Sequence, residues 1–389
     1  MTKNILIIPS WYDTPDNPVR GIFFKEQAQA LSKYFKDNNI EATVTILALQ
    51  QYNIRERHLY KGIKKVTLSE EIGIKTIRAR MFHIPKLEEI NIRRGAKYLK
   101  KLILKTETML GINFDLVHIH SVQFSGIWYA LSGLEIPYVI TEHSSAFFRN
   151  RIGETEKKYL PRVFNNSRAV IAVGKGLAEK IQVYSQKKVD VIFNIVKDVS
   201  FTTFEHLERD DRFIFFSLGY DIKVKGFDIL LNAFAKFLKN EKAVLLLGGL
   251  TEEGQKQLEI LAESLGIQQN LVLKGRIPHD EVYKMMKQSS CFVLPSRFET
   301  FGIVLAESMY VGRPVIASRT GGPDSFVTEN TGLLIEPGNE EQLVNALLEM
   351  KKNYSKYNQN EIRQYALETF TGNVICDKIY NIYKKILIN

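Results

Sequence analysis

The segment Ser296–Ser308, SRFETFGIVLAES, places two glutamates, Glu299 and Glu307, on either side of seven mostly apolar residues. The run before it, CFVLPS at residues 291–296, has the composition of a buried β-strand, and GIVLAESMYVG at residues 302–312 is typical of a helix. We therefore expect Glu299 on a loop at the carboxyl end of a strand, and Glu307 within the helix that follows. A strand, a loop and a helix in this order form the repeating unit of an open α/β sheet.

Ligands of open α/β sheets bind in the crevice outside the carboxyl ends of the strands. A helix start near Phe301 and Gly302 would also offer free backbone N–H groups to an anion. A nucleotide sugar would use all of these features, with Glu299 toward one sugar, the N–H groups on the diphosphate and Glu307 on the ribose. The residues alone equally allow a loop glutamate in solvent and a helix glutamate paired with a nearby cation.

Short apolar runs alternate with helical patterns along almost the whole chain, which favours parallel strands joined by crossover helices. In the first half we expect strands at residues 5–9, 43–47, 115–120, 137–141, 168–173 and 188–193. The pattern restarts after residue 212, with strands expected at 212–218, 242–249, 270–275, 290–296, 313–318 and 331–337. The fold class is therefore α/β, with two doubly wound Rossmann-like units.

The polar segment 193–211 lacks clear periodicity and marks the boundary between the two units. We predict a first domain at residues 1–197 and a second at residues 198–370. Residues 371–389 form an amphipathic helix after a break near TFTGN. Its simplest interpretation is a terminal helix on the second domain, but we expect it to return toward the first.

The net charge of +10 is unevenly spread, with +12 in residues 1–200 and −2 in the remainder. This asymmetry suggests a negatively charged partner, which could be an anionic membrane surface, a phosphorylated acceptor or nucleic acid. We exclude nucleic acid, because no binding module and no aromatic residues interleaved for base stacking accompany the charge. The N-terminus does not resemble a signal peptide and no run approaches a membrane span, so we expect a cytoplasmic protein, with peripheral association at the inner face of the plasma membrane as a further expectation.

Several other motifs do not indicate a cofactor or a metal. Gly174 and Gly176 follow a strand, but Glu179 stands at the third position of a dinucleotide fingerprint. The chain contains no Asp-x-Asp pair that would hold a diphosphate-bound metal, so we expect no metal requirement. We interpret His118 and His120 as histidines at the carboxyl end of a strand or in core hydrogen bonds, because no third zinc ligand is near in the sequence.

Taken together, RFETFGIVLAES, RPVIASRTGGPDSFV and TGLLIEPGN resemble glycosyltransferase family 4, whose members are retaining enzymes of GT-B fold with a cleft between two Rossmann-like domains. The segments SLGYDIKVKGFDILLNAF, LVLKGRIPHDEV, VIFNIVKD, DLVHIH and VITEHS resemble further family motifs in the expected order. The N-terminal IPSWYDTPDNPVRGIFFKEQ looks like the subgroup that acts in bacterial surface-polysaccharide assembly.

The resemblance implies a donor substrate and roles for individual residues. The donor would be a nucleotide-diphosphate sugar, a UDP-sugar in preference to a GDP-sugar, and no cofactor is required. The implied catalytic residues are Glu299, which orients sugar hydroxyls, Lys225 on the diphosphate, and His143 near the transferred sugar. The implied donor-binding residues are Glu307, Thr300, Phe301, Gly302, Ile303, Arg276, Ile277, Gly219 and Gly21.

Two positions depart from the family pattern. Tyr220 stands where the family often has an arginine, so the second cation on the diphosphate would come from Lys223 or Arg276. The N-terminal loop has the single glycine Gly21 where the family often has a pair.

The acceptor would be a saccharide or a polyprenyl-phosphate-linked sugar bound by the first domain. Its segment NIRRGAKYLKKLILKTETML places Arg93, Lys97 and Lys101 at helical spacing, with Leu99, Leu102 and Ile103 on another face. We interpret this helix either as an ordinary amphipathic helix with a solvated basic face or as a surface that docks on an anionic inner leaflet. Arg149 is a further candidate for acceptor or membrane contact.

The resemblance implies transfer of a hexosyl or N-acetylhexosaminyl group with retention by front-face displacement, in which the leaving phosphate takes the acceptor proton and no enzyme nucleophile is needed. Two alternatives stay open. A nucleotide-sugar epimerase or hydrolase of similar fold would release free nucleotide without an acceptor. A non-catalytic sugar-nucleotide-binding protein would bind the donor without turnover.

Overall fold

The computed structural model describes residues 2–14, 20–53, 65–197 and 212–388, and it divides into two compact units. Unit 1 comprises residues 1–173, 177–195 and 372–389, and unit 2 comprises residues 174–176 and 196–371. Most of the polar segment that we predicted as the domain boundary, residues 198–211, lies outside the described residues, as do residues 15–19 of the N-terminal motif.

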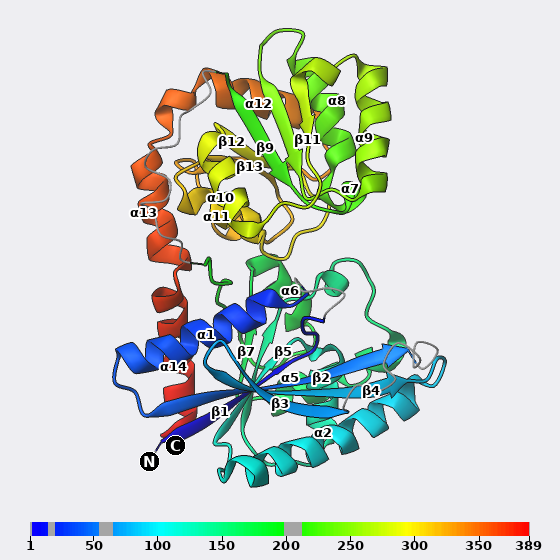
Figure 1. The fold of residues 1–389 in the computed structure, drawn as a ribbon, viewed down its shortest axis with the longest axis vertical. Helices are drawn as coiled ribbons and strands as arrows, with labels where there is room; N and C mark the ends of the chain where they lie inside the picture. The colour runs from blue at the N-terminus through cyan, green and yellow to red at the C-terminus, as the bar shows by residue number, and fades with distance from the viewer. Residues whose placement is uncertain (1, 15–19, 54–64, 198–211, 389) are drawn as a thin grey trace. The chain divides into compact units, whose positions relative to one another are not determined.

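Unit 1 is built on a sheet of eight strands in the order β3-β4-β2-β1-β5-β6-β7-β8 (Figure 1). The strands are β1 (Lys3–Pro9), β2 (Ala42–Asn53), β3 (Val66–Glu71), β4 (Ile74–His83), β5 (Leu116–His120), β6 (Tyr138–Glu142), β7 (Ala169–Ala172) and β8 (Val189–Val191). The helices are α1 (Ile22–Asp37), α2 (Glu88–Leu110), the π-helix η2 (Val122–Gly126), α3 (Ile127–Leu131), the 3-10 helix η3 (Ser145–Phe147), α4 (Glu154–Lys157), α5 (Leu160–Asn166), α6 (Lys175–Gln182) and α14 (Gly372–Leu387).

The hairpin β3–β4 was missed in the sequence and corrects the expectation of parallel strands throughout. β3 pairs antiparallel with β4, and β4 in turn pairs parallel with β2. The two-residue turn places both Ile72 (φ 47°) and Gly73 (φ 75°) in the left-handed region. A β-branched residue is unusual there, so the turn lacks the Asn-Gly or Asp-Gly signature by which a hairpin is recognised.

The C-terminal helix α14 completes the core of unit 1. Its residues Ile375, Ile379 and Tyr383 are buried in one cluster with Ile5 and Leu31 of β1 and α1. The break predicted near TFTGN is confirmed, because α13 (Gln359–Phe370) ends just before Thr371 and α14 begins after it. The helix belongs to unit 1, so it does not pack as a terminal helix of unit 2.

Unit 2 is a parallel sheet of six strands in the order β11-β10-β9-β12-β13-β14, and all six predicted strands are confirmed. They are β9 (Ile214–Leu218), β10 (Val244–Gly248), β11 (Leu271–Leu273), β12 (Cys291–Leu294), β13 (Val315–Ser318) and β14 (Gly332–Ile335). The α-helices are α7 (Ile222–Lys225), α8 (Phe227–Phe237), α9 (Glu252–Leu265), α10 (His279–Gln288), α11 (Ile303–Tyr310), α12 (Glu340–Lys352) and α13. In Figure 1, α8 and α9 lie on one side of this sheet, and α10 and α11 lie on the other.

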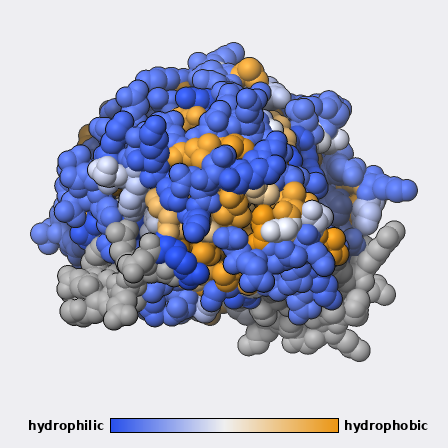
Figure 2. All heavy atoms as spheres, turned by 90° about the horizontal axis from the view of Figure 1, so that it is seen from above, coloured by the Kyte–Doolittle hydropathy of each residue, from blue (hydrophilic) through white to orange (hydrophobic). Residues whose placement is uncertain are grey.

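The surface agrees with the ordinary globular composition of the chain. Hydrophilic residues cover most of the face in Figure 2, and hydrophobic residues gather mainly in a band across its middle. Within the described residues, no helix combines the length and the apolar composition that crossing a bilayer requires.

Candidate active site

The candidate donor site lies where the strand order of unit 2 reverses. The chain proceeds from β9 outward to β10 and β11 on one side, and then returns to β12 on the other side of β9. β9 and β12 are therefore adjacent and parallel, while the loops that leave their carboxyl ends diverge. A crevice at such a switch point is the usual ligand site of a doubly wound sheet.

Two charged side chains meet at this point. Lys225 ends the short helix α7 after β9, and Glu299 lies on the loop after β12. The Nζ atom of Lys225 lies 2.8 Å from Oε2 of Glu299, and the two side chains are 20% and 15% exposed. The structure thus joins two residues that the sequence had only assigned to one site. The pair is partly buried but still open to a ligand.

Glycine at position 219 makes room for this lysine. A Cβ atom built on Gly219 would lie 2.6 Å from Cγ of Lys225, closer than unbonded carbon atoms approach. Gly248 has a similar role at the end of β10, because its Cβ would lie 2.4 Å from Cδ1 of Ile277. A larger residue at position 219 or 248 would therefore crowd the predicted residues Lys225 and Ile277 at the carboxyl ends of β9 and β10.

Helix α11 begins at the same edge. Its N-cap, Gly302, has φ 90°, and no side chain of the described residues caps the helix. The backbone N–H groups of Gly302 and Ile303 therefore remain available to an anion, whereas that of Leu305 donates to the Gly302 carbonyl oxygen. The ring of Phe301 is buried against Phe326 and Phe370, with ring centroids 5.1 and 5.8 Å away, and it anchors the loop that carries Thr300.

Glu307 is buried on α11, at 5% exposure, one turn after Ile303. Its Oε1 atom lies 3.0 Å from Nε2 of His279, the first residue of α10, whose side chain is 42% exposed. The sequence reasoning considered a cation beside Glu307 but did not name His279. Its only signal was position, since it comes two residues after Ile277, where the loop after β11 ends.

The structure separates the two candidates for the second diphosphate cation. Lys223 lies 2.7 Å from Asp228, and Asp228 also accepts hydrogen bonds from both terminal nitrogens of Arg297. Lys223 is thus part of an ionic cluster. Arg276, in contrast, is exposed and forms no ion pair within the part of the chain that the structure describes. Arg276 therefore stays the predicted second cation.

In unit 1, the histidines gather at the carboxyl ends of β5 and β6. His118 is fixed in the core, with Nδ1 2.5 Å from the Tyr383 hydroxyl and Nε2 2.7 Å from the Thr141 hydroxyl. His120 Nδ1 lies 3.0 Å from Nε2 of His143. The interpretation of His118 and His120 as core and strand-end residues is confirmed.

Burial controls the charge of these side chains. It lowers the pKa of His118 and His143 to about 3, and the proximity of His118 adds to the shift of His143. His120 also has a pKa well below its ordinary value, through burial and then through both neighbouring histidines. His143 is therefore a neutral ring at neutral pH, and it can exchange hydrogen bonds without carrying charge.

Glu142, the last residue of β6, holds the loop that follows. It accepts hydrogen bonds from the Ser121 hydroxyl and from the backbone N–H groups of Val122, His143 and Ser144, all at 2.7–2.8 Å. Burial raises the pKa of Glu142 above its ordinary value, and these donors oppose the shift. Glu142 was not singled out in the sequence, although it fixes the backbone of His143.

The remaining predicted residues of unit 1 have separate positions. Gly21 is the N-cap of α1 at φ 69°, and a Cβ there would lie 2.9 Å from the carbonyl oxygen of Trp11. Arg149 lies just beyond η3, on the loop that begins at His143. Arg93 forms an ion pair with Glu89, with Nε 3.1 Å from Oε1. Lys97 and Lys101 line a cavity whose lining does not include Arg93. All three lie exposed on α2, and their common role in docking stays a prediction.

Two cavities of about 240 and 440 Å³ adjoin at the carboxyl edge of the unit 1 sheet, and both are lined by Gln51, His83 and Phe124. Trp11 lines the first cavity and Trp128 the second. Phe124 has φ 60° and ψ −88° within η2, a strained conformation for a residue with a side chain. Such strain is typical of ligand sites.

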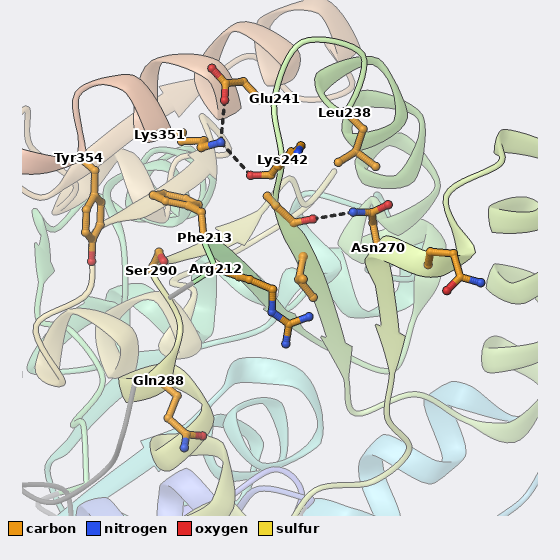
Figure 3. Close-up of a pocket in the computed structure, with 13 residues that line it drawn as sticks. Arg212, Phe213, Leu238, Glu241, Lys242, Asn270, Gln288, Ser290, Lys351 and Tyr354 are labelled. Atoms are coloured by element: carbon orange, nitrogen blue, oxygen red, sulfur yellow. Dashed lines mark hydrogen bonds and ion pairs between the residues drawn. The ribbon is translucent and has the colours of Figure 1, made fainter. Parts of the chain in front are cut away.

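A further cavity, of about 980 Å³, lies at the opposite edge of the unit 2 sheet (Figure 3). It is lined by residues at the amino ends of the strands, among them Phe213 before β9 and Ser290 before β12. Lys351 on its wall is already bound to Glu241 at 2.6 Å. The candidate donor residues lie at the other ends of these strands, so this cavity is not part of their site.

Comparison with known proteins gives consistent matches over most of the chain. Residues 28–198 match Glycosyltransferase Family 4, and residues 198–368 match Glycosyl transferases group 1. An uncharacterized glycosyltransferase of Methanocaldococcus jannaschii is 30% identical over 278 residues, which cover 70% of this chain and 74% of that protein. TuaC of Bacillus subtilis, a glycosyltransferase named for teichuronic acid biosynthesis, is 25% identical over 357 residues, or 88% of each chain.

Among solved structures, Anabaena HepE in complex with UDP and glucose matches with a TM-score of 0.67 and 18% identity. The match covers 98% of this chain and 100% of that chain. At this level of identity the likeness shows the fold.

The buried histidines predict a pH dependence of unit 1. An unfolded histidine has a pKa near 6.5, whereas His118 has a pKa of about 3 when folded, so the unfolded state binds more protons between these values. The free energy of unfolding should fall as the pH drops below about 6.5, by up to about 1.4 kcal/mol per pH unit for each histidine. Glu142 acts in the opposite direction. Because its pKa is raised in the folded state, its contribution to the free energy of unfolding falls as the pH rises above 4.5.

Urea unfolding followed by tryptophan fluorescence at pH 7, 6 and 5 measures this, because both tryptophans of the chain, Trp11 and Trp128, lie in unit 1. The His118→Gln variant should show a shallower pH slope, and His279→Gln, which alters a half-exposed histidine of unit 2, should not. Equal slopes for His118→Gln and the parent would contradict the assignment.

Proposed function

The chain belongs to glycosyltransferase family 4, and we propose that it moves a sugar from a nucleotide-diphosphate sugar to an acceptor hydroxyl with retention of configuration. The proposed donor is a UDP-sugar in preference to a GDP-sugar, which the UDP complex of HepE supports. The observation that carries the proposal is the Lys225–Glu299 pair at the switch point of unit 2, beside the uncapped start of α11.

The donor would lie along this edge with each part against a matching group. Lys225, Arg276 and the N–H groups at Gly302 and Ile303 would bind the diphosphate. Glu299 would accept hydrogen bonds from sugar hydroxyls, and the buried Glu307 would do the same for the ribose, with His279 holding it in place. Thr300 and Phe301 would contribute backbone contacts, and the backbone at Ile277 would meet the base.

The charge on the leaving diphosphate grows as the glycosidic bond breaks. A lysine and a helix start, already fixed at the site, stabilise such charge without reorganisation. Glu299 is engaged with Lys225, which suits a carboxylate that orients hydroxyls better than one that attacks the anomeric carbon. We therefore propose front-face displacement, with the leaving phosphate as the base that accepts the acceptor proton.

Unit 1 would bind the acceptor, a saccharide or a lipid-linked sugar of the cell envelope, which the similarity to TuaC supports. The two adjoining cavities at the carboxyl edge of its sheet combine aromatic rings with side-chain amides, the mixture that orients small polar ligands. His143, neutral and buried at the same edge, would lie near the transferred sugar, and Gly21 would place the start of α1 there. Arg149 would contribute to acceptor contact.

The proposed activity is tested by incubating the protein with UDP- and GDP-sugars and with saccharide and polyprenyl-phosphate-linked acceptors. We expect product with an unchanged anomeric configuration, at a rate that survives exhaustive EDTA treatment because the chain has no Asp-x-Asp pair. Inversion of configuration, release of sugar without an acceptor, or an absolute need for added manganese would overturn the corresponding part of the proposal.

Substitution of Glu307 by Gln should weaken UDP binding, because hydrogen bonds to a charged acceptor contribute about 1.5–3 kcal/mol, or roughly 10- to 100-fold in Kd. Titration calorimetry with UDP measures this. The matched control is His279→Gln, which breaks the same pair while the carboxylate remains. If both variants bind UDP like the parent, then the pair has only a structural role.

Substitution of Lys225 by Ala should reduce kcat far more than donor affinity, since the charge that it meets grows in the transition state. We expect a loss on the order of 100-fold or more in kcat. Lys223→Ala is the control, because it removes a cation two residues away that is bound to Asp228. A kcat for Lys225→Ala within a few-fold of the parent would refute this role.

A further inference from the structure

A cavity of about 520 Å³ in unit 1 is lined by residues of α2 and of the carboxyl-terminal part of β4. Five of its lining residues are cations, namely Lys65, Arg80, Arg94, Lys97 and Lys101, and none is an acid. Three of them follow one another at helical spacing on α2, so their charges face the same opening.

This arrangement is electrostatically unfavourable when the cavity is empty of anions. Like charges three and four residues apart on a helix destabilise it. Arg94, Lys97 and Lys101 form no ion pair with any residue in the described parts of the chain. Arg93, their neighbour on the same helix, is balanced by Glu89. Three cations without an ion-pair partner in the described residues therefore line one cavity.

The walls add a hydrogen-bonding group and apolar side chains. The hydroxyl of Tyr98 is buried and has no hydrogen-bond partner within the described residues. The Nζ atom of Lys65 lies over the Tyr98 ring, 4.9 Å from its centroid. Phe82, which lines the cavity, is 37% exposed, and Met81 adds a second apolar side chain to the lining. Cations and apolar side chains in one lining suit an anionic group on an apolar or amphipathic carrier.

We propose that this cavity binds a phosphate ester and is a site separate from the donor site of unit 2. Arginine offers paired donors to phosphate oxygens, and lysine adds point charge, so the mixture of both is the usual protein environment of that group. Membrane attachment would then depend on Arg94, Lys97 and Lys101 as a set, rather than on Arg93. The same chemistry is presented by the headgroup of an anionic lipid and by a free phosphate ester, and the experiment separates the two.

The first measurement is calorimetric titration with inorganic pyrophosphate. The cavity variant Arg94→Gln/Lys97→Gln/Lys101→Gln should bind pyrophosphate at least about tenfold more weakly than the parent, because charge-assisted hydrogen bonds are lost. The matched control is Arg93→Gln/Lys33→Gln/Lys36→Gln, which removes the same charge from exposed cations of unit 1 outside the cavity. Lys225→Ala serves as a second control, because pyrophosphate could also bind at the donor site.

Binding that persists in Lys225→Ala and is lost in the cavity variant supports the proposal, whether or not the protein transfers sugar. Binding that is lost only in Lys225→Ala, or equally in the cavity variant and its matched control, overturns it. This readout does not require a donor, so it is independent of the proposed function.

The second measurement is cosedimentation with phosphatidylglycerol and phosphatidylcholine vesicles at low salt. If the phosphate belongs to a lipid, the cavity variant should pellet about tenfold less with phosphatidylglycerol than the matched control, and glycerol phosphate should compete. If the two variants pellet alike while only the cavity variant loses pyrophosphate, the ligand is a soluble phosphate ester. A parent protein that binds neither pyrophosphate nor phosphatidylglycerol vesicles refutes the site.

Discussion

The parallel pairing of β9 with β12 is the constraint on which the donor edge of unit 2 depends. It brings together the loops of two strands that are far apart in the sequence, so that Lys225 and Glu299, 74 residues apart, meet at 2.8 Å. The loop that carries Glu299 leads directly into α11, and Glu307 lies one turn after the start of that helix. A shift of either strand would separate the ion pair, the helix start and the buried carboxylate at once, because backbone hydrogen bonds fix all three.

The two units place opposite electrostatic environments at the carboxyl ends of their strands. In unit 2, Lys225, Glu299 and Arg276 lie partly open to solvent, where ionised groups are inexpensive. In unit 1, burial keeps His118, His120 and His143 neutral, and Glu142 is satisfied by four donors. One edge is thus suited to a ligand whose charge changes during reaction. The other is suited to an uncharged ligand that must be held in a fixed orientation.

The sequence predicted unit 2 well, because strands covered on both faces appear as continuous apolar runs and their loops carry specific motifs. It failed where the signal depended on turn chemistry or on the direction of a side chain. The hairpin β3–β4 was missed because Ile72 occupies a position that usually requires Asn, Asp or Gly. Spacing along α2 did not single out Arg94, which lines a cavity together with Lys97 and Lys101, and it did not reveal the contact between Arg93 and Glu89. The contact between His279 and Glu307 joins two different helices, α10 and α11, so no local pattern could reveal it.

The return of the chain to unit 1 through α14 means that neither unit is one continuous piece of sequence. During synthesis, unit 1 cannot close its core as soon as its own sheet has emerged, because Ile375, Ile379 and Tyr383 leave the ribosome only after unit 2. Unit 2, whose core needs no residue after 371, can fold first although it is encoded second. A gene cut between the units would therefore yield a second half able to form its core, and a first half with apolar surface that only the missing tail can cover.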